Sequence, residues 1–394
     1  MLARLPALIH ALVFTCSSRT SKICALEPKK KMLTADEVTK SIDPLLRLAS
    51  SHFAPMALSA AVRLGLPDVI GSACASVSDI AEGLGGNNVD IDALSRTLRL
   101  LCAAGALEQQ QCTDGEALYC LTSVGALLQT EEGLPAHQPS LACCVESWTD
   151  ARELKAWSAL PDLILGNCGG TSAYETANGG TVASQLRDDR SYARFVRYIS
   201  STEIPALLDA YASWSSIGGG SGTVVDIGGG YGEAMSALSR RHPSLQCINL
   251  DLEVVIRDAP ARDGVTHVAG DMFDASTLPP CDVLLMKHVL ADWADGDAAK
   301  ALKACGTALR GASARLLVAD VVLPVGADAN GSGDVNLNVD ALLMLVGNRG
   351  ERTETRWRRL AATAGFEVES IIDTASPSIN LLVLAPSTGG RGAL

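Results

Sequence analysis

The chain has 394 residues, of which 47% are hydrophobic and 19% charged, and its formal net charge is −12. That length fits two or three domains with a sizeable core, and the composition excludes global disorder. The acidic excess argues against a nucleic-acid partner, whose phosphates need basic residues, and leaves a small-molecule partner open. No apolar run after the N-terminus approaches the ~20 residues needed to span a bilayer, so we expect no membrane partner.

The N-terminus differs in charge from the rest of the chain. Residues 1–26 contain Arg4, Arg19 and Lys22 but no acidic residue, although the chain has 44 acidic residues in all. This asymmetry predicts a targeting leader over residues 1–31, for a mitochondrion or chloroplast. The apolar stretch 5–14 is also consistent with a secretory signal or with the first part of a two-step plastid address. An ordinary N-terminus is the alternative, and it goes with a cytoplasmic protein.

Residues 32–210 show mainly helical periodicity, with apolar residues three and four positions apart. Candidate helix N-caps are Ser76, Ser78 and Asp92, and the leucines at 94, 98 and 101 form one stripe. Two strand-like segments, 106–112 and 117–122, flank a turn at Asp114–Gly115. Helices followed by a hairpin outline a winged helix. Its recognition-helix region holds only Arg96 and Arg99, so an interaction role is favoured over DNA binding.

Beyond the glycine-rich segment 217–222 the pattern changes to alternating strands and helices. Five strand-like runs alternate with helices, and two more flank Ser376–Pro377 near the end. This order predicts an α/β fold with a doubly wound, mostly parallel sheet over residues 211–386, closed by an antiparallel pair. Residues 387–394 form a tail.

Twelve cysteines are scattered along the chain without a CxxC pair. The adjacent Cys143 and Cys144 suit neither a common zinc spacing nor a disulfide framework. We therefore predict that most cysteines are reduced and partly buried.

A glycine-rich turn at the end of the first strand of this sheet is the main candidate for a ligand site. Glycines let the backbone turn sharply and approach a ligand, and ligands of such sheets bind beyond the strand ends. Asp226, Asp251 and Asp271 stand at the ends of the first three strands, and Met272 and Phe273 offer an apolar wall for an adenine. DIGGGYGE matches the dinucleotide fingerprint poorly. Acids at three strand ends suit the cationic S-adenosylmethionine, which has no phosphate to repel, and their spread over strand ends implies no metal.

Five motifs occur in the order seen in class I S-adenosylmethionine-dependent methyltransferases: DIGGGYG, LD, GDMF, MKHVLADW and GERT. The chain resembles most closely the plant caffeate and flavonoid O-methyltransferases and the acetylserotonin O-methyltransferases. The resemblance covers nearly the whole chain after the leader and implies a homodimer formed by the N-terminal region. It also implies the cofactor-binding residues Gly228, Gly230, Asp251, Asp271, Met272 and Lys287.

The resemblance fails at one functionally decisive position. In this family a histidine immediately precedes the Asp-Trp pair and takes the proton from the substrate hydroxyl, and here that position is Ala291, before Asp292 and Trp293. Alanine accepts no proton. The two acids that orient the family's histidine look retained, as Asp320 and Glu351.

Sulfur methylation would tolerate the loss of this base. A hydroxyl acceptor loses ~10²–10⁴-fold without general-base help, whereas a thioether has lone pairs and no proton to remove. Asp292, Asp320 and Glu351 would then stabilise a sulfonium product. An algal subgroup that methylates 4-methylthio-2-hydroxybutyrate, in dimethylsulfoniopropionate synthesis, resembles this chain in its missing histidine, its leader and its alanine-rich composition.

The acceptor's carboxylate would need a cation or hydroxyl donor in the pocket. Candidates are Arg194, Arg197 and Tyr198, although a solvated helix face also explains them. Trp148, Trp157 and Trp293 could form an aromatic wall beside a sulfonium, and each is also a plausible core residue.

Two alternatives stay open. The first is O-methylation of a phenol or other hydroxyl, with His288 as a substitute base. The second is a pseudoenzyme or winged-helix regulator that only binds S-adenosylmethionine or its product.

Overall fold

The computed structural model describes residues 33–86, 88–111, 116–135, 138–186, 190–324, 335–347, 350–376 and 378–387. The predicted leader, the turn at Asp114–Gly115 and almost all of the predicted tail lie outside these residues. Tertiary contacts divide the chain into two units, Met1–His52 and Phe53–Leu394. The predicted domain boundary at residues 210 and 211 stays a prediction.

The first unit contains one described helix, α1 (Ala35–Ala49). Thr34 caps it in a capping box, in which the backbone N–H of Glu37 donates to Thr34 Oγ1 at 3.2 Å and Glu37 Oε2 accepts from the backbone N–H of Thr34 at 2.9 Å. Val38, Ile42 and Leu45 are exposed on its apolar face, and none of its residues is buried in the monomer.

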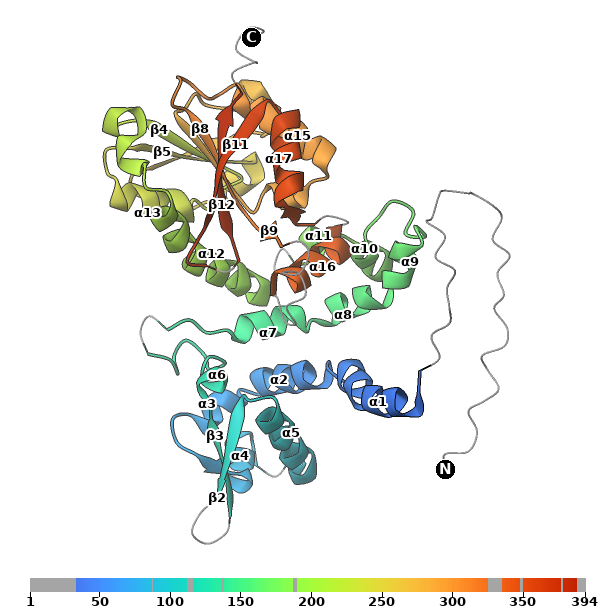
Figure 1. Cartoon of the computed structure of the whole chain (residues 1–394). Coiled ribbons are helices and arrows are strands. Elements are labelled where there is room, and N and C mark those ends of the chain that lie inside the picture. Colours follow the sequence, from blue (N-terminus) through green and yellow to red (C-terminus); the bar gives the residue numbers. More distant parts are fainter. Residues whose placement is uncertain are drawn as a thin grey trace. The chain divides into compact units, whose positions relative to one another are not determined.

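The second unit begins with short helices and a small sheet (Figure 1). The elements are α2 (Phe53–Arg63), α3 (Leu66–Ile70), β1 (Ala75–Ser76), α4 (Val77–Gly83), α5 (Ile91–Ala103), β2 (Leu107–Gln111), β3 (Ala117–Leu121) and α6 (Ser123–Ala126). The sheet has the order β1-β3-β2, with antiparallel pairs, so the predicted hairpin is confirmed. Leu94, Leu98 and Leu101 are buried together, as their spacing predicts.

Two of the three predicted N-caps are wrong. Ser76 caps α4 as predicted, and its hydroxyl accepts from the backbone N–H of Asp79 at 3.2 Å. Ser78 lies inside α4. Asp90, rather than Asp92, caps α5, because its side chain accepts from the backbone N–H of Ala93 at 3.0 Å.

A disulfide corrects the prediction for two of the cysteines. Cys74 and Cys120 are bonded to each other, which ties the residue before β1 to the central strand β3. The other cysteines that the structure describes are free, and most of them are buried. Sequence spacing gave no signal for this pair, because 46 residues separate the partners.

Six helices connect the small sheet to the large one: α7 (Ala142–Trp148), α8 (Ala151–Ser158), α9 (Leu160–Ile164), α10 (Ala173–Asn178), α11 (Val182–Leu186) and α12 (Arg190–Ala210). The 3₁₀ helix η1 (Trp214–Gly220) then leads into the first strand of the large sheet. The C-terminal half of α12 is apolar on one side, with Ile204, Leu207 and Leu208 buried, and it packs on α13.

The large sheet has seven strands in the order β11-β12-β8-β7-β4-β5-β6. Its strands are β4 (Thr223–Ile227), β5 (Gln246–Asp251), β6 (Val265–Ala269), β7 (Val283–Lys287), β8 (Arg315–Asp320), β11 (Phe366–Asp373) and β12 (Asn380–Pro386). The first five are mutually parallel, and β12 is antiparallel to both of its neighbours. The predicted doubly wound sheet with an antiparallel closing pair is therefore confirmed.

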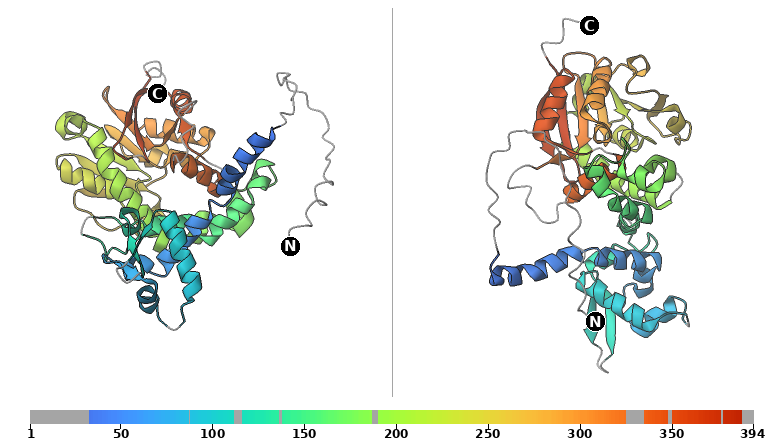
Figure 2. Two further views of the ribbon diagram at one scale, coloured as in Figure 1. Left: turned by 60° about the horizontal axis from the view of Figure 1, so that its bottom comes forward. Right: turned by 90° about the vertical axis from the view of Figure 1, so that its right-hand side faces the viewer.

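Helices cover both faces of this sheet (Figure 2). The helices are α13 (Glu233–Arg241), α14 (Glu253–Ile256), α15 (Asp295–Gly306) and α17 (Glu354–Thr363); α16 (Val335–Gly347) lies against α8 and α10 instead. Val224 joins a core cluster with α12 and α13, whereas Val225 and Ile227 join a second cluster with α15 and α17. Alternate residues of a strand point to opposite faces, so both faces are apolar and the strands read as continuous hydrophobic runs.

Short elements occupy the ends of the parallel strands. They are η2 (Ala275–Thr277), η3 (Leu290–Asp292), β9 (Val322–Leu323) and β10 (Arg352–Thr353), and β9 pairs with β10 in parallel. Because the carboxyl ends of parallel strands meet at one edge, these elements bring the MKHVLADW, VAD and GERT segments to the same edge.

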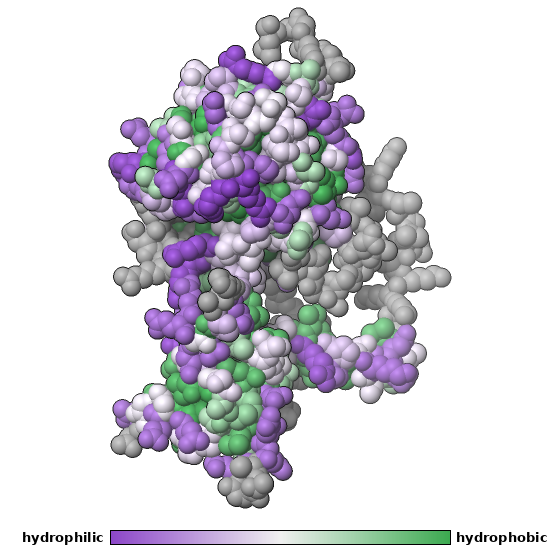
Figure 3. All heavy atoms as spheres, turned by 90° about the vertical axis from the view of Figure 1, so that its left-hand side faces the viewer, coloured by the Kyte–Doolittle hydropathy of each residue, from purple (hydrophilic) through white to green (hydrophobic). Residues whose placement is uncertain are grey.

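The surface varies between regions of the second unit (Figure 3). Hydrophilic residues cover most of the sheet domain in that view, and apolar residues gather in the lower part, over the region of α2 to α6. Exposed large apolar side chains of this region are Phe53, Met56, Leu64, Ile91 and Val124. Among the described residues, no helix combines the length and the apolar character needed to cross a membrane.

Candidate active site

The loop after β4 has a backbone that only glycine can adopt readily. Gly230 has φ +57° with open space where a Cβ would stand, so a ligand can approach the backbone there. At Gly229 a Cβ would lie 2.2 Å from Asn249 Oδ1 and 2.5 Å from Asp226 Oδ2. Gly229 thus packs against buried polar groups, whereas Gly230 faces open space.

Asp251 and Asn249 of β5 hold this loop in place. Asp251 Oδ2 accepts from the backbone N–H of Gly230 at 2.8 Å, and Asp251 Oδ1 accepts from the backbone N–H of Leu252 at 2.7 Å. Asn249 Nδ2 donates to the carbonyl of Gly230 at 2.9 Å. The structure therefore brings Asp251 and Asn249 to the glycine loop, and the contact of Asp251 with a ribose stays a prediction.

Two buried oxygens beside the loop have no hydrogen-bond partner within the described residues. They are Asp226 Oδ1 and Asn249 Oδ1. Burial raises the pKa of Asp226 to about 7, and the nearby Lys287 opposes that rise. Unpaired buried acceptors are costly, and a cationic or N–H-bearing ligand would satisfy them.

An aromatic pair stands at the end of β6. The rings of Phe273 and Trp293 meet edge to face, with 4.8 Å between their centroids. Asp271 Oδ1 accepts from the backbone N–H of Phe273 at 2.9 Å, and Met272 packs against the core. Trp293, predicted to contact the acceptor, thus lies beside Phe273, predicted to contact the cofactor.

These residues fit S-adenosylmethionine. The glycine cradle and the orphaned oxygens lie at the strand ends where this fold binds ligands. In the predicted binding mode Asp251 would accept ribose hydroxyls, Phe273 would contact an adenine and Asp226 would attract a cationic group. A group of three His, Cys, Asp or Glu side chains suited to a metal ion does not occur among the described residues.

Ala291 lies in η3, 4% exposed, and Arg352 fixes the position of this segment. Arg352 Nη1 donates to the carbonyl of Leu290 at 2.7 Å, and Nη2 donates to the carbonyl of Trp293 at 2.6 Å. Arg352 Nε also pairs with Asp295 at 2.8 Å. The GERT segment is therefore bonded to the backbone on both sides of Ala291.

Two buried carboxyl groups near Ala291 have oxygens without a hydrogen-bond partner. Both side-chain oxygens of Asp320 and Oε2 of Glu351 lack a hydrogen-bond partner within the described residues. Burial raises the pKa of Asp320, and burial together with the neighbouring Asp320 raises the pKa of Glu351 to about 8. Asp292, at the exposed end of η3, adds to the rise at Asp320.

His288 occupies the space between two buried acids. Its Nε2 lies 2.9 Å from both carboxylate oxygens of Glu203, and its Nδ1 lies 3.5 Å from Asp320 Oδ1, an ion-pair distance that is long for a hydrogen bond. Burial would lower the pKa of His288, but Asp320 and Glu203 outweigh it and raise the pKa to about 9. The ring therefore carries two protons at neutral pH.

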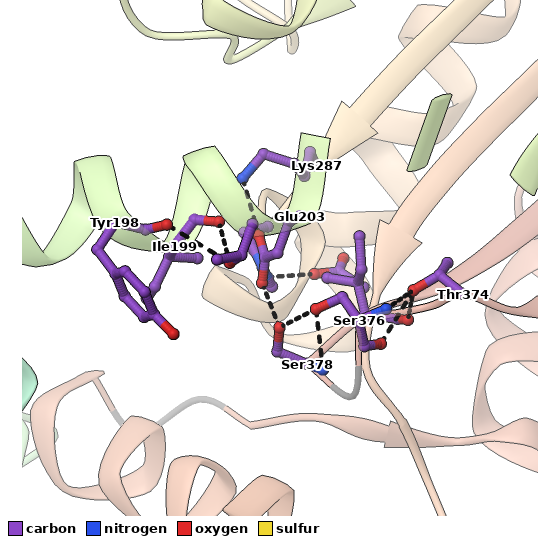
Figure 4. A network of polar contacts seen from close by, with 11 residues as sticks. Tyr198, Ile199, Glu203, Lys287, Thr374, Ser376 and Ser378 are labelled. Carbon is purple, nitrogen blue, oxygen red and sulfur yellow. Dashed lines mark hydrogen bonds and ion pairs between the residues drawn. The ribbon is translucent and has the colours of Figure 1, made fainter. Parts of the chain in front are cut away.

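Lys287 also bonds to Glu203, with Nζ 3.2 Å from Oε2. The structure thus gives Lys287 a protein partner besides the predicted cofactor. Figure 4 shows Lys287 and Ser378 reaching Glu203 from opposite sides.

The predicted acceptor-binding residues of α12 are only partly brought to this edge. Tyr198 is half-buried, one turn before Glu203 on the same helix (Figure 4). Arg197 is exposed, and Arg194 pairs with Glu146 of α7. Trp148 packs edge to face on Phe195 with 6.0 Å between ring centroids, and Trp157 is exposed on α8.

Sequence reasoning missed Glu203, Asn249 and Arg352. Arg352 stood inside the recognised GERT motif, so that motif was an available signal. Asn249 stands two residues before Asp251 in β5, on the same face of the strand. Glu203 had no local signal, because its partners are 84 to 175 residues away.

The fold and this edge of the sheet define an S-adenosylmethionine-dependent methyltransferase. An O-methyltransferase domain model matches residues 157–367, and an O-methyltransferase dimerisation domain model matches residues 46–131. The chain belongs to this O-methyltransferase family.

Curated relatives and solved structures agree with this assignment. The chain is 32% identical to (iso)eugenol O-methyltransferase of Clarkia breweri, over 82% of this chain and 88% of the relative. It is also 32% identical to caffeic acid 3-O-methyltransferase of Catharanthus roseus, over 86% and 93%. The structure of mitomycin 7-O-methyltransferase superposes with a TM-score of 0.73 at 25% identity, over 90% of this chain and all of that one.

Human N-acetylserotonin methyltransferase, solved in complex with S-adenosylmethionine, has a TM-score of 0.71 at 19% identity, over 91% of this chain and all of that one. At that identity the likeness concerns the fold.

Proposed function

We propose that this protein methylates the sulfur of a small thioether acid and uses no general base. One observation carries the proposal: Ala291 stands where the family's histidine is expected, and both nitrogens of the neighbouring His288 face buried carboxylates. A histidine with both nitrogens protonated accepts no proton. The residues around Ala291, namely His288, Asp320 and Glu351, form the acceptor edge. This part of the site therefore lacks the base that hydroxyl methylation needs.

The chemistry of a thioether matches this edge. S-adenosylmethionine, when bound, supplies a methyl group activated by its sulfonium. A lone pair of the acceptor's sulfur forms the new carbon–sulfur bond, and no proton leaves the acceptor. The residues of the chain contribute by positioning the acceptor and excluding water.

The product of this reaction is a second sulfonium, and the unpaired carboxyl groups support its formation. Asp320 and Glu351 are 0% and 3% exposed, and among the described residues no hydrogen bond reaches the Asp320 oxygens or Glu351 Oε2, although His288 Nδ1 stands at ion-pair distance from Asp320 Oδ1. In their ionised forms these groups would stabilise a positive charge that develops on sulfur, because electrostatic interactions strengthen where water is excluded; with a pKa of about 8, Glu351 is ionised only in part at neutral pH. Transfer to a neutral phenol through a phenolate would gain nothing from them.

We propose 4-methylthio-2-hydroxybutyrate as the acceptor, within dimethylsulfoniopropionate synthesis. Support comes from the resemblance to the algal subgroup and from the missing histidine. Tyr198 is a hydroxyl donor for the acceptor's carboxylate, because it is half-buried on the helix that carries Glu203. Arg197 is a weaker candidate, since its side chain is exposed.

The alternative function is O-methylation of a phenol or other hydroxyl. The names of the curated relatives favour it, and so does the His288–Asp320 pair, which has the composition of a base and its orienting acid. In that case His288 would have to lose its proton and turn away from Glu203. A protein that only binds S-adenosylmethionine is the remaining possibility.

We further propose a homodimer and an organellar location. The dimerisation domain and the exposed apolar side chains of α1 and α2 support the dimer. The predicted leader, residues 1–31, is the sole support for a mitochondrion or chloroplast.

The test uses the full chain with methyl-labelled S-adenosylmethionine at neutral pH. The acceptors are 4-methylthio-2-hydroxybutyrate, its 4-methoxy analogue and caffeate. We expect label in the thioether alone, since the analogue differs only by oxygen in place of the reacting sulfur. Label in caffeate alone would replace this proposal with O-methylation. Absence of label in all three, with calorimetric binding of S-adenosylmethionine, would support a binding protein.

A further inference from the structure

Glu203 is a fully buried carboxylate that joins three distant segments of the chain. It stands in α12 and accepts from Lys287 Nζ at 3.2 Å, from His288 Nε2 at 2.9 Å and from Ser378 Oγ at 2.7 Å. Lys287 is the last residue of β7 and His288 follows it, and Ser378 lies between β11 and β12. In Figure 4 the helix brings Glu203 to the centre of this polar network.

Burying a carboxylate is unfavourable unless it is paired, so Glu203 needs partners that compensate for the loss of water. Burial would raise the pKa of Glu203, but the hydrogen bond and charge of His288, then Lys287 and Ser378, hold that pKa below its usual value. Glu203 is therefore an anion at neutral pH. None of the cofactor motifs includes it.

The backbone at His288 supports a specific role for this contact. His288 has φ +53° and is, among the described residues, the one non-glycine residue with positive φ. Such a conformation is strained for a residue with a Cβ and persists where surrounding contacts impose it. The side chain is 32% exposed, so the ring lies at an opening rather than in the core.

We propose that Glu203 is a positioning residue that determines acceptor specificity, because it binds Nε2 of His288 and keeps this imidazole from serving as a base for hydroxyl acceptors. The consequence for specificity rests on the proposed thioether chemistry. The effect of Glu203 on the protonation of His288 is independent of that chemistry.

The charges around His288 decide its protonation. Glu203 of α12 and Asp320 of β8 face its two nitrogens, Lys287 of β7 is the neighbouring cation, and Glu351 lies beyond Asp320. Two acids at the nitrogens outweigh one lysine that is itself paired with Glu203. Removal of the Glu203 charge would leave Lys287 uncompensated, which disfavours a second proton on the ring.

The test is a histidine titration by NMR on the full chain with ¹³C-labelled histidine. The chain has six histidines, and loss of one signal in His288→Asn assigns His288. We expect the native His288 signal to titrate above pH 8, and that of Glu203→Gln to titrate at least one pH unit lower. Ser378→Ala is the matched control, because it removes a hydrogen bond from the same carboxylate and leaves the charge. Its His288 should shift by less than half a unit.

Activity supplies a second readout. Glu203→Gln should label caffeate at a rate that rises with pH through the lowered pKa of His288, and Glu203→Asp should restore the native behaviour. A native His288 that titrates at or below pH 6.5 would overturn the inference even if Glu203→Gln fails to fold. An unchanged His288 pKa in a folded Glu203→Gln would overturn it too. Neither result depends on which acceptor the native protein methylates.

Discussion

The carboxyl ends of the parallel strands hold two neighbouring regions, a cofactor edge at the glycine loop and an acceptor edge around Ala291. The two regions differ in whether they keep the residues that the family's motifs have there. Around Gly228–Gly232, Asp251 and Asp271 the chain keeps the motif residues and holds them with local bonds, such as Gly230 to Asp251 at 2.8 Å. Around Ala291 the base is missing and its surrounding acids persist. A binding site for the methyl donor can therefore stay fixed while the chemistry of the acceptor changes.

The largest effect is expected from a variant that restores a base to the acceptor edge. Ala291→His should raise labelling of caffeate by roughly 10²–10⁴-fold, because an imidazole beside Asp320 and Glu351 would take the phenol's proton. It should slow labelling of the thioether by filling the same space. The measurement is a rate with methyl-labelled S-adenosylmethionine. Ala291→Leu is the control, since it fills space without a base, and an equal gain with leucine would contradict the explanation.

The next largest effect concerns the scaffold of the acceptor edge. Arg352→Lys should lower the free energy of unfolding by about 3 kcal/mol, because Lys cannot replace the three hydrogen bonds of the buried Arg352 and leaves carbonyls of Leu290 and Trp293 unpaired. Urea unfolding measures this change. Arg356→Lys should cost much less, because Arg356 is half exposed and makes one ion pair with the same Asp295. Equal losses of stability in the two variants would show that the hydrogen bonds of Arg352 around η3 stabilise the fold no more than the exposed ion pair of Arg356 does.

The cofactor edge is tested by Asp251→Ala. This variant should weaken S-adenosylmethionine binding by roughly 10- to 100-fold, since a carboxylate that bonds the glycine loop and faces the ligand is lost. Isothermal calorimetry measures the affinity for S-adenosylmethionine. The loss of affinity should be the same with and without an acceptor in the cell. Asp258→Ala, an exposed acid a few residues on, should bind normally. Native affinity in Asp251→Ala would remove this residue from the site.

The smallest expected effect is a change of stability with pH. The folded-state pKa of His288 is about 9, above its ordinary value of 6.5, and that of Glu351 is about 8, above 4.5. The folded state therefore holds more protons than the unfolded state, so stability falls as pH rises from 6 through 9. We expect Tm to fall steadily over this range, by roughly 2–4 °C for each kcal/mol lost.

The control for this prediction is Glu351→Gln, which should flatten the decline below pH 8. A Tm that rises from pH 6 to 9 would contradict the assignment of protons to this edge.

The fold and the cofactor edge could be predicted from the sequence because their signals are local. Val224, Val225 and Ile227 make an apolar strand, interrupted only by Asp226, that ends in glycines, and the acids that follow the next two strands stand at or within a few residues of the strand ends. The acceptor edge could be predicted only through the absence of a base at Ala291. Its other features depend on contacts across the fold.

Glu203 and the Cys74–Cys120 disulfide illustrate the limit. Glu203 reads as one more polar position in an amphipathic helix, and only the placement of α12 beside the ends of β7 and β12 makes it a partner of His288. The disulfide joins residues 46 apart that the small sheet brings together. Neither feature has a local pattern, because each depends on which elements become neighbours.

The central claim is that methyl transfer here needs no base, and a pH profile tests it most directly. The measurement is kcat for 4-methylthio-2-hydroxybutyrate from pH 6 to 9, with saturating S-adenosylmethionine and the full chain. The account predicts a nearly flat profile, and the same profile in His288→Asn after correction for folded fraction. A rate that rises tenfold per pH unit below a pKa, and that His288→Asn abolishes, would contradict it.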